Sequence, residues 1–194
     1  MGTRDPEATK RRILDAALRE FSDKGIAGAR VDAIAERACV NKRMLYYYFG
    51  SKEGLFREIL KRRVVQNNAS GHDHDVSAAG RLARRQRRLA QEEDYVRLLA
   101  WEALESRSGP VIDDAQRRGY FKEWVTAIEA EQRAGRIPAE LDAAQLVLTE
   151  VCLVIGPLML PQLTRLITGC SAHGATQLER RTEFLDTLEA RIYS

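Results

Sequence analysis

The chain has 194 residues, 44% of them hydrophobic and 30% charged, a composition typical of a globular protein that can bury a core. Its three cysteines, Cys39, Cys152 and Cys170, are an odd number with no CxxC spacing, so neither a disulfide framework nor a zinc site is indicated. The N-terminal residues are polar and no apolar run reaches the length of a membrane span, so we expect a cytoplasmic protein.

Charge is divided unevenly along the chain. Residues 1–68 contain 15 Lys and Arg against 9 Asp and Glu, a net charge of +6, whereas residues 69–194 contain 16 against 19, a net charge of −3. A basic N-terminal part suits a protein whose one end binds a polyanion such as nucleic acid. The alternative is a chance imbalance on a solvated surface.

The first predicted helix begins after Asp5, which can cap it, and ends at Gly25. A proline in its first turn and an acid near the positive end of the dipole support this start. Apolar residues recur at helical spacing over residues 13–21 and predict the buried face. The basic residues 10–12 either contact phosphate or are solvated.

Residues 31–52, VDAIAERACVNKRMLYYYFGSK, predict two short helices joined by a tight turn. Small and apolar residues at helical spacing form the first of them, and Asn41 can cap the second, which runs from Lys42 to Tyr48 and stops at Gly50. This second helix carries two adjacent cations and three consecutive tyrosines. A helix so short and so rich in hydrogen-bond donors needs another surface to pack against. A nucleic-acid groove suits such a helix.

The order and spacing of eleven residues in this region resembles the DNA-binding segment of the TetR family of transcriptional regulators. They are Ile34, Ala35, Ala38, Val40, Leu45, Tyr46, Phe49, Ser51, Lys52, Leu55 and Phe56. Two positions depart from the family pattern, because Arg30 stands where a capping threonine is usual and Cys39 where glycine is usual. The resemblance implies an all-α fold of about nine helices, with a three-helix helix-turn-helix head and a larger helical body.

A fourth helix is predicted from Ser51 to about Gln66, and the polar segment 67–77 predicts a loop. With the resemblance, these features predict three parts: a helix-turn-helix DNA-binding domain over 1–50, a linking helix over 51–68, and an effector-binding and dimerisation domain over 74–194.

From about residue 78 onward the chain predicts helices and no strand. The helix near 81–90 has leucines on one face and, on the other, five arginines that we expect to be solvated: Arg81, Arg84, Arg85, Arg87 and Arg88. An apolar side follows over 95–104, including Leu104. A long helix is predicted from Gly109 to about Ala134. Its expected inward side chains are Phe121, Trp124, Val125 and Ile128.

Two helices complete the predicted body. Asp142 and Gln145 predict a capping box that begins an apolar helix reaching about Thr168, which Gly156 and Pro157 should kink or break near its middle. A last helix is predicted over about 175–192, with Phe184 and neighbouring leucines on its inward side. The resemblance implies that the segments at about 142–168 and 175–192 form the contact between two copies of the chain.

The resemblance also implies which side chains meet DNA. Four lie where the family contacts the major groove: Lys42, Arg43, Met44 and Tyr47. Lysine and arginine can donate to guanine, and methionine or tyrosine can pack on a thymine methyl. Three lie where the family contacts the sugar-phosphate backbone: Tyr46, Tyr48 and Lys52. Val31 lies at the start of the first of the two predicted short helices, which we call the reader helices. The alternative for Tyr46 or Tyr48 is a core position.

No catalytic motif is present in the body, so we expect no enzyme and no cofactor. For this family the resemblance implies an effector pocket in the body. The candidate lining residues are Trp101, Glu102, Phe121, Trp124, Cys152, Leu158 and Met159. The alternative for each is a core position, or a solvated position for Glu102.

Two further sequence features are candidate sites. Residues 72–75, His-Asp-His-Asp, alternate on a predicted loop, which fixes no tetrahedral geometry, so we expect no metal site. Cys39 beside the reader helix lacks a clear thiolate-stabilising partner, so we expect no redox switch there.

The function that the resemblance implies is a homodimeric, ligand-responsive, DNA-binding transcriptional regulator. More specifically, we expect a repressor that a small-molecule effector releases from a palindromic operator in double-stranded DNA. Two alternatives stay open: a DNA-binding regulator without a small-molecule effector, and a helical enzyme with an incidental basic head.

Overall fold

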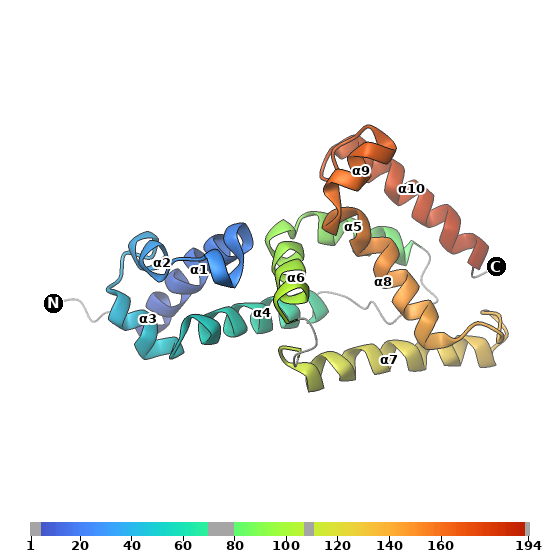
Figure 1. Cartoon of the computed structure of the whole chain (residues 1–194). Helices are drawn as coiled ribbons and strands as arrows, with labels where there is room; N and C mark the ends of the chain where they lie inside the picture. Colours follow the sequence, from blue (N-terminus) through green and yellow to red (C-terminus); the bar gives the residue numbers. More distant parts are fainter. Residues whose placement is uncertain (1–4, 70–79, 107–110, 193–194) are drawn as a thin grey trace. The chain divides into compact units, whose positions relative to one another are not determined.

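The computed structural model describes residues 5–69, 80–106 and 111–192, and this part of the chain contains helices and no strand (Figure 1). The helices are α1 (Pro6–Gly28), α2 (Val31–Arg37), α3 (Lys42–Phe49), α4 (Lys52–Ala69), α5 (Arg81–Ala90), α6 (Glu93–Ser106), α7 (Asp114–Arg133), α8 (Ala143–Met159), α9 (Pro161–Thr168) and α10 (Ala175–Ile192). The all-α prediction is therefore confirmed. The described residues form ten helices rather than about nine, because the predicted helix over 142–168 is divided into α8 and α9.

The chain divides into two compact units. Unit 1 comprises the described residues within 1–66 and 97–113, which include α1–α3, most of α4 and most of α6. Unit 2 comprises those within 67–96 and 114–194, which include α5 and α7–α10. The division does not follow the sequence, because a segment of α6 belongs with the N-terminal helices.

The core of unit 1 is built by apolar side chains of α1, α2, α3 and α4. Its fully buried members include Ile13, Phe21, Ile34, Leu45, Leu55, Phe56 and Leu60. The rings of Phe21 and Phe56 meet edge to face with their centroids 5.3 Å apart, which is a favourable aromatic geometry. The predicted inward faces of the first and fourth helices are thus confirmed.

Helix α1 does not end at Gly25 as predicted but continues to Gly28. Its helical geometry is interrupted at Gly25, where the C-terminal part of α6 packs. Gly25 has φ 66° and ψ −178°, and a Cβ atom at this position would lie 2.7 Å from the Trp101 ring. The indole Nε1 of Trp101 donates to the carbonyl of Ser22 at 3.2 Å. The carboxylate of Glu105 accepts from the amide of Ile26 at 2.9 Å. These contacts satisfy backbone groups that the break in α1 leaves without helical partners.

Unit 2 is centred on α5, which contacts α8 and α10, while α7 contacts α8. The prediction of a solvated arginine face on α5 is wrong for two of its five members, since Arg81 is 1% exposed and Arg85 is 5% exposed. Arg81 donates two hydrogen bonds of 2.7 Å to Glu150 of α8. The guanidinium of Arg85 lies 3.7 Å from the centroid of the Trp124 ring. Buried charges require such partners, and both partners lie far away in sequence.

The predicted break at Gly156 and Pro157 is wrong in position. Helix α8 continues through Pro157 to Met159, and the chain turns at Leu160, so that α8 and α9 are bent by 87°. Pro157 cannot donate to the carbonyl of Leu153, and the side chain of Arg181 in α10 supplies a donor to that oxygen at 2.5 Å. The turn instead falls before Pro161, which disfavours helical geometry at Leu160 and begins α9.

Other differences from prediction are local. Helix α7 begins at Asp114 rather than near Gly109, and α4 reaches Ala69, beyond the expected start of the loop. Three side chains expected to point inward are exposed instead: Leu104, Phe121 and Phe184. Asp142 accepts from the amide of Gln145 at 2.8 Å, as its predicted capping role requires. None of the described helices is by itself long and apolar enough to cross a membrane, and α8 and α9 meet that criterion only as a bent pair.

The pairing of Arg181 with the Leu153 carbonyl predicts a dependence on Pro157. Arg181→Met should lower the free energy of unfolding by about 1 kcal/mol, because the carbonyl loses its donor. In a Pro157→Ala background the alanine N–H can bond to Leu153, so the same substitution should cost less. Urea unfolding of the two single variants and the double variant measures this coupling. Additive costs would show that Arg181 acts independently of the proline.

Candidate nucleic-acid interface

The first reader helix, α2, is held by a buried carboxylate of α1. Arg30 precedes α2 and supplies no side-chain cap. Its amide instead donates to Glu20 at 3.2 Å, and Glu20, 2% exposed, also accepts from Lys24 at 2.8 Å. Glu20 thus has the role that the acid of a capping box has within one helix. Burial raises the pKa of Glu20, but the hydrogen bonds from Lys24 and Arg30 and the charge of Arg37 outweigh it, so the net shift is downward.

The turn between α2 and α3 closes with a left-handed residue. Cys39 has φ 52°, a conformation that favours glycine, and its amide donates to Glu36. The amide of Val40 donates to Ala35 at 3.0 Å. These two bonds form a Schellman motif, so the turn keeps the geometry of a glycine turn although cysteine occupies the position.

Helix α3 presents most of its side chains to solvent. Asn41 caps it by accepting from the amide of Arg43 at 2.9 Å, as predicted, and Leu45 is its buried side chain. Tyr47 is 79% exposed. The other predicted contact residues of α3 divide into exposed (Lys42, Arg43, Tyr46) and half-buried (Met44, Tyr48) side chains. The alternative of a core position is therefore wrong for Tyr46, which is 44% exposed, and stays open for the half-buried Tyr48.

The remaining two predicted DNA contacts lie at the edges of the reader. Val31 is half-buried in the first turn of α2. Ser51 caps α4 by accepting from the amide of Gly54 at 2.9 Å. The ammonium of Lys52 approaches the carbonyls of Ala27 at 3.5 Å and Ala29 at 3.3 Å. Lys52 therefore also ties α4 to the segment that leads into α2.

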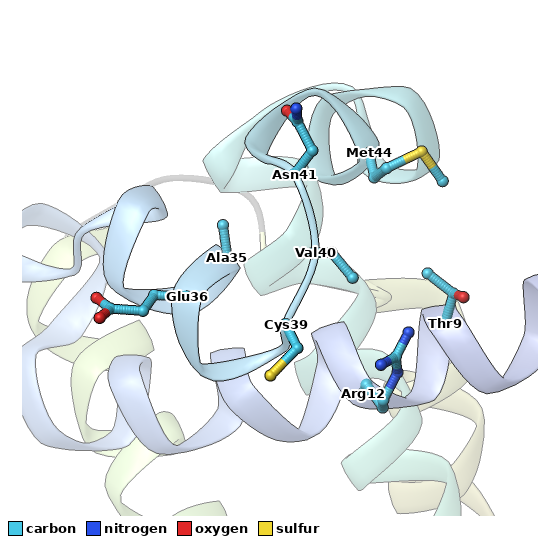
Figure 2. A pocket seen from close by; sticks show the side chains of 8 residues that line it. All are labelled: Thr9, Arg12, Ala35, Glu36, Cys39, Val40, Asn41 and Met44. Carbon is cyan, nitrogen blue, oxygen red and sulfur yellow. The ribbon is translucent and has the colours of Figure 1, made fainter.

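A cavity of about 230 Å³ lies beside the turn. Its lining residues come from α1, α2, the turn and α3 (Figure 2): Thr9, Arg12, Ala35, Glu36, Cys39, Val40, Asn41 and Met44. Arg12 also lines a second cavity together with Asp15, Arg19 and Arg37, so cations outnumber acids there. Cys39 of the turn and Met44 of α3 both line the first cavity.

The candidate effector residues are distributed over both units. Trp101 and Glu102 belong to unit 1, where Glu102 is buried and accepts from the amide of Ile112 at 3.1 Å. Phe121 and Trp124 of unit 2 stack with centroids 6.4 Å apart, and Trp124 is buried. In unit 2, Cys152 is exposed, Leu158 is buried and Met159 is half-buried.

Sequence reasoning missed the supporting residues Glu20, Arg81 and Arg85. An acid or arginine at a helical position looks solvated unless its partner is known, and these partners come from other helices. The alternating segment 72–75 lies outside the described residues. Within the residues that are described, no group of three His, Cys, Asp or Glu side chains could hold a metal ion.

Residues 13–59 match the model of bacterial regulatory proteins of the tetR family, and residues 79–189 match the model of the tetracyclin repressor-like C-terminal domain. The HTH-type transcriptional repressor SCO4008 of Streptomyces coelicolor is 34% identical over 169 residues, which cover 87% of this chain and 88% of that repressor. The HTH-type transcriptional regulator RutR of Escherichia coli is 47% identical over 60 residues, which cover 31% of this chain and 28% of RutR.

Solved structures share the fold. The transcriptional regulator SCO4942 from Streptomyces coelicolor has a TM-score of 0.78 at 24% identity, covering 95% of this chain and 98% of that one. The regulator FadR from Bacillus subtilis, solved in complex with stearoyl-CoA, has a TM-score of 0.66 at 18% identity, covering 91% and 97%.

The left-handed conformation of Cys39 predicts that glycine is better at this position. Cys39→Gly should raise the free energy of unfolding by about 1 kcal/mol, because glycine adopts a positive φ without steric cost. Cys39→Ala is the control, since it removes the thiol but keeps the Cβ, and it should bring no gain. Thermal unfolding compares them. Equal stabilities of the glycine and alanine variants would contradict the assignment of strain.

The pKa shift of Glu20 predicts a pH-dependent contribution. Because this pKa is lowered on folding, the stabilisation is complete above the carboxyl pKa of the unfolded chain and is lost as the pH falls through the lower, folded value. Glu20→Gln should therefore cost about 1–3 kcal/mol at pH 7, and less in acid. Urea unfolding at pH 7 and at a pH below the folded pKa of Glu20 tests this, with the exposed Glu36→Gln as control. A cost independent of pH would contradict a charge-based role.

Proposed function

The chain belongs to the TetR family of bacterial regulatory proteins and is a DNA-binding transcriptional regulator rather than an enzyme, and we propose that it acts as a homodimeric repressor. In this proposal a small-molecule effector releases the repressor from a roughly palindromic operator. The observation that carries it is the exposure of the donor-rich face of α3, which buries Leu45 and leaves two cations and Tyr47 to solvent.

The proposed DNA contacts are those of the capped reader. Base edges would be read by Lys42, Arg43, Met44 and Tyr47, and the sugar-phosphate backbone would be held by Tyr46, Tyr48 and Lys52. Val31 would make a contact at the start of α2. The rigid placement of α3 supports this assignment, since its N-cap, the closed turn and the Glu20 anchor of α2 fix it before DNA arrives. Lys52 would contribute both to this placement and to phosphate binding.

The proposed dimer contact uses residues of about 142–168 and 175–192. Large apolar side chains are exposed there, and a second copy would cover them. The set is Leu148, Leu160, Leu163, Leu166, Ile167 and Phe184, with Leu166 83% exposed and Ile167 74% exposed. Large apolar side chains exposed to this extent favour an interaction surface, and two copies joined by a twofold axis match a palindromic operator.

The proposed effector site lies in the body, where its candidate residues in unit 2 are Phe121, Trp124, Cys152, Leu158 and Met159. The solved complex of FadR with stearoyl-CoA supports a small-molecule site in this fold. An effector would act by favouring a body conformation in which the two heads are wrongly spaced, and DNA would weaken effector binding by the same factor.

A regulator without an effector is the second candidate, and the packing of Trp124 favours it. Arg85 lies on the Trp124 ring, and Arg81 pairs with Glu150 nearby in unit 2. These side chains pack around Trp124, as expected if Trp124 is a core residue rather than part of a ligand site. The domains that we propose remain 1–50 for DNA, 51–68 as linking helix and 74–194 for the body, and the described residues within 97–113 group with the N-terminal helices.

Two substitutions separate base reading from backbone binding. Arg43→Ala should relax sequence preference and weaken binding to the preferred duplex about tenfold or more, because a base contact is lost. Lys52→Ala should weaken binding to all duplexes alike and lower the salt slope by about 1. Selection from a random duplex library followed by fluorescence anisotropy at several salt concentrations measures both.

The matched control is Lys122→Ala, an exposed cation of α7 whose loss changes the net charge equally. It should leave preference and affinity close to those of the parent. If both head variants behaved like this control, α3 would not be the reader.

A further inference from the structure

An ion pair joins the two reader helices at their exposed ends. The ammonium of Lys42, the first residue of α3, lies 2.8 Å from the carboxylate of Asp32 in the first turn of α2. Both side chains are exposed. The hydrogen bond and charge of Lys42 lower the pKa of Asp32, and Asp32 in turn raises the pKa of Lys42. The pair is therefore charged at neutral pH.

The carboxylate of Asp32 contributes little to the stability of the fold. Exposed ion pairs contribute little, because water and salt screen them. Asp32 does complement the dipole of α2, but an acid elsewhere in the first turn would serve equally. Near DNA, moreover, an aspartate repels phosphate and lowers general affinity. A carboxylate in the first turn of α2, paired with the first residue of the proposed reader α3, therefore points to recognition.

The chemistry of the pair matches the edge of one base pair. The N-terminal residues of a recognition helix contact base edges, and Lys42 is the first residue of α3. Lysine donates to the O6 and N7 atoms of guanine, whereas a carboxylate accepts from the N4 amino group of cytosine. The separation of 2.8 Å between the two charged groups is smaller than the spacing of about 3.4 Å between successive base pairs. Both groups can thus address the same step.

We propose that Asp32 is a specificity-determining residue that acts with Lys42 as one unit to select a G·C base pair in each half-site. Lys42 donates to the guanine and Asp32 accepts from the cytosine. At other positions the carboxylate meets acceptors or phosphates, so misplaced binding is penalised. This inference rests on the proposed entry of α3 into the major groove.

The test compares the sequence preferences of three variants that each remove one negative charge from α2. Asp32→Ala should lose the G·C preference at one symmetric pair of positions by about tenfold while binding unrelated DNA more tightly. Asp32→Asn should shift that position towards A·T, because asparagine pairs with adenine. Glu36→Gln, at an exposed position of the same helix, should keep the parent's preference. Selection from a random duplex library, read by sequencing, measures all three.

A cycle with Lys42→Met tests whether the two side chains act together. In the Lys42→Met background, Asp32→Ala should change the base preference at that position less than it does in the parent. Thermal unfolding of every variant checks that α2 and α3 remain folded, and Asp32→Asn, which keeps an oxygen acceptor, is the more conservative change.

The outcomes separate this inference from the function on which it rests. If the parent selects no duplex sequence, the proposed DNA reader fails. If the parent selects a motif and both Asp32 variants recover the same motif as Glu36→Gln, the reader stands and Asp32 has no part in specificity. If the parent itself selects A·T at the position whose preference changes in the Asp32 variants, the assignment to G·C is overturned.

Discussion

The reader helix α3 buries only Leu45 among its own side chains, so its position has to be imposed by the segments around it. A helix of eight residues is not stable alone, because nucleation costs more than so few hydrogen bonds return. The neighbours supply what is missing. Asn41 caps it, the Schellman turn at Cys39 sets its direction, and Glu20 anchors the preceding helix from within α1. The exposed face can then consist almost entirely of groups that suit DNA.

Unit 2 follows a different rule, in which buried charge is matched across helices. Arg81 of α5 binds Glu150 of α8 through two hydrogen bonds, and Arg181 of α10 serves the carbonyl that Pro157 leaves without a donor. Such contacts have strict geometry, and losing one partner leaves a buried polar group. These contacts restrict how α5, α8 and α10 can pack against one another, whereas Leu163 and Leu166 of α9 are exposed.

Local signals in the sequence were sufficient for part of this structure. The caps at Asp5, Asn41 and Asp142 depend on residues a few positions apart, and all three predictions are confirmed. Gly25 does interrupt the helical geometry of α1, although the helix continues beyond it to Gly28. The reader's exposed face followed from the family resemblance.

Features decided by distant partners could not be predicted in this way. The burial of Arg81 depends on Glu150, the continuity of α8 through Pro157 depends on Arg181, and the Arg30 departure is compensated by Glu20. Hydrophobic periodicity assigns a side chain to a face of a helix, but it does not identify the residue that the side chain contacts on a neighbouring helix.

The central claim, that two copies each place α3 in the major groove of one palindromic duplex, is tested most directly by stoichiometry and spacing. Native mass spectrometry should find two chains on the selected duplex. Inserting about 5 base pairs between the half-sites, roughly half a helical turn, should abolish tight binding, because the second reader then faces the wrong side. One chain per duplex, with affinity independent of the spacing, would contradict the account.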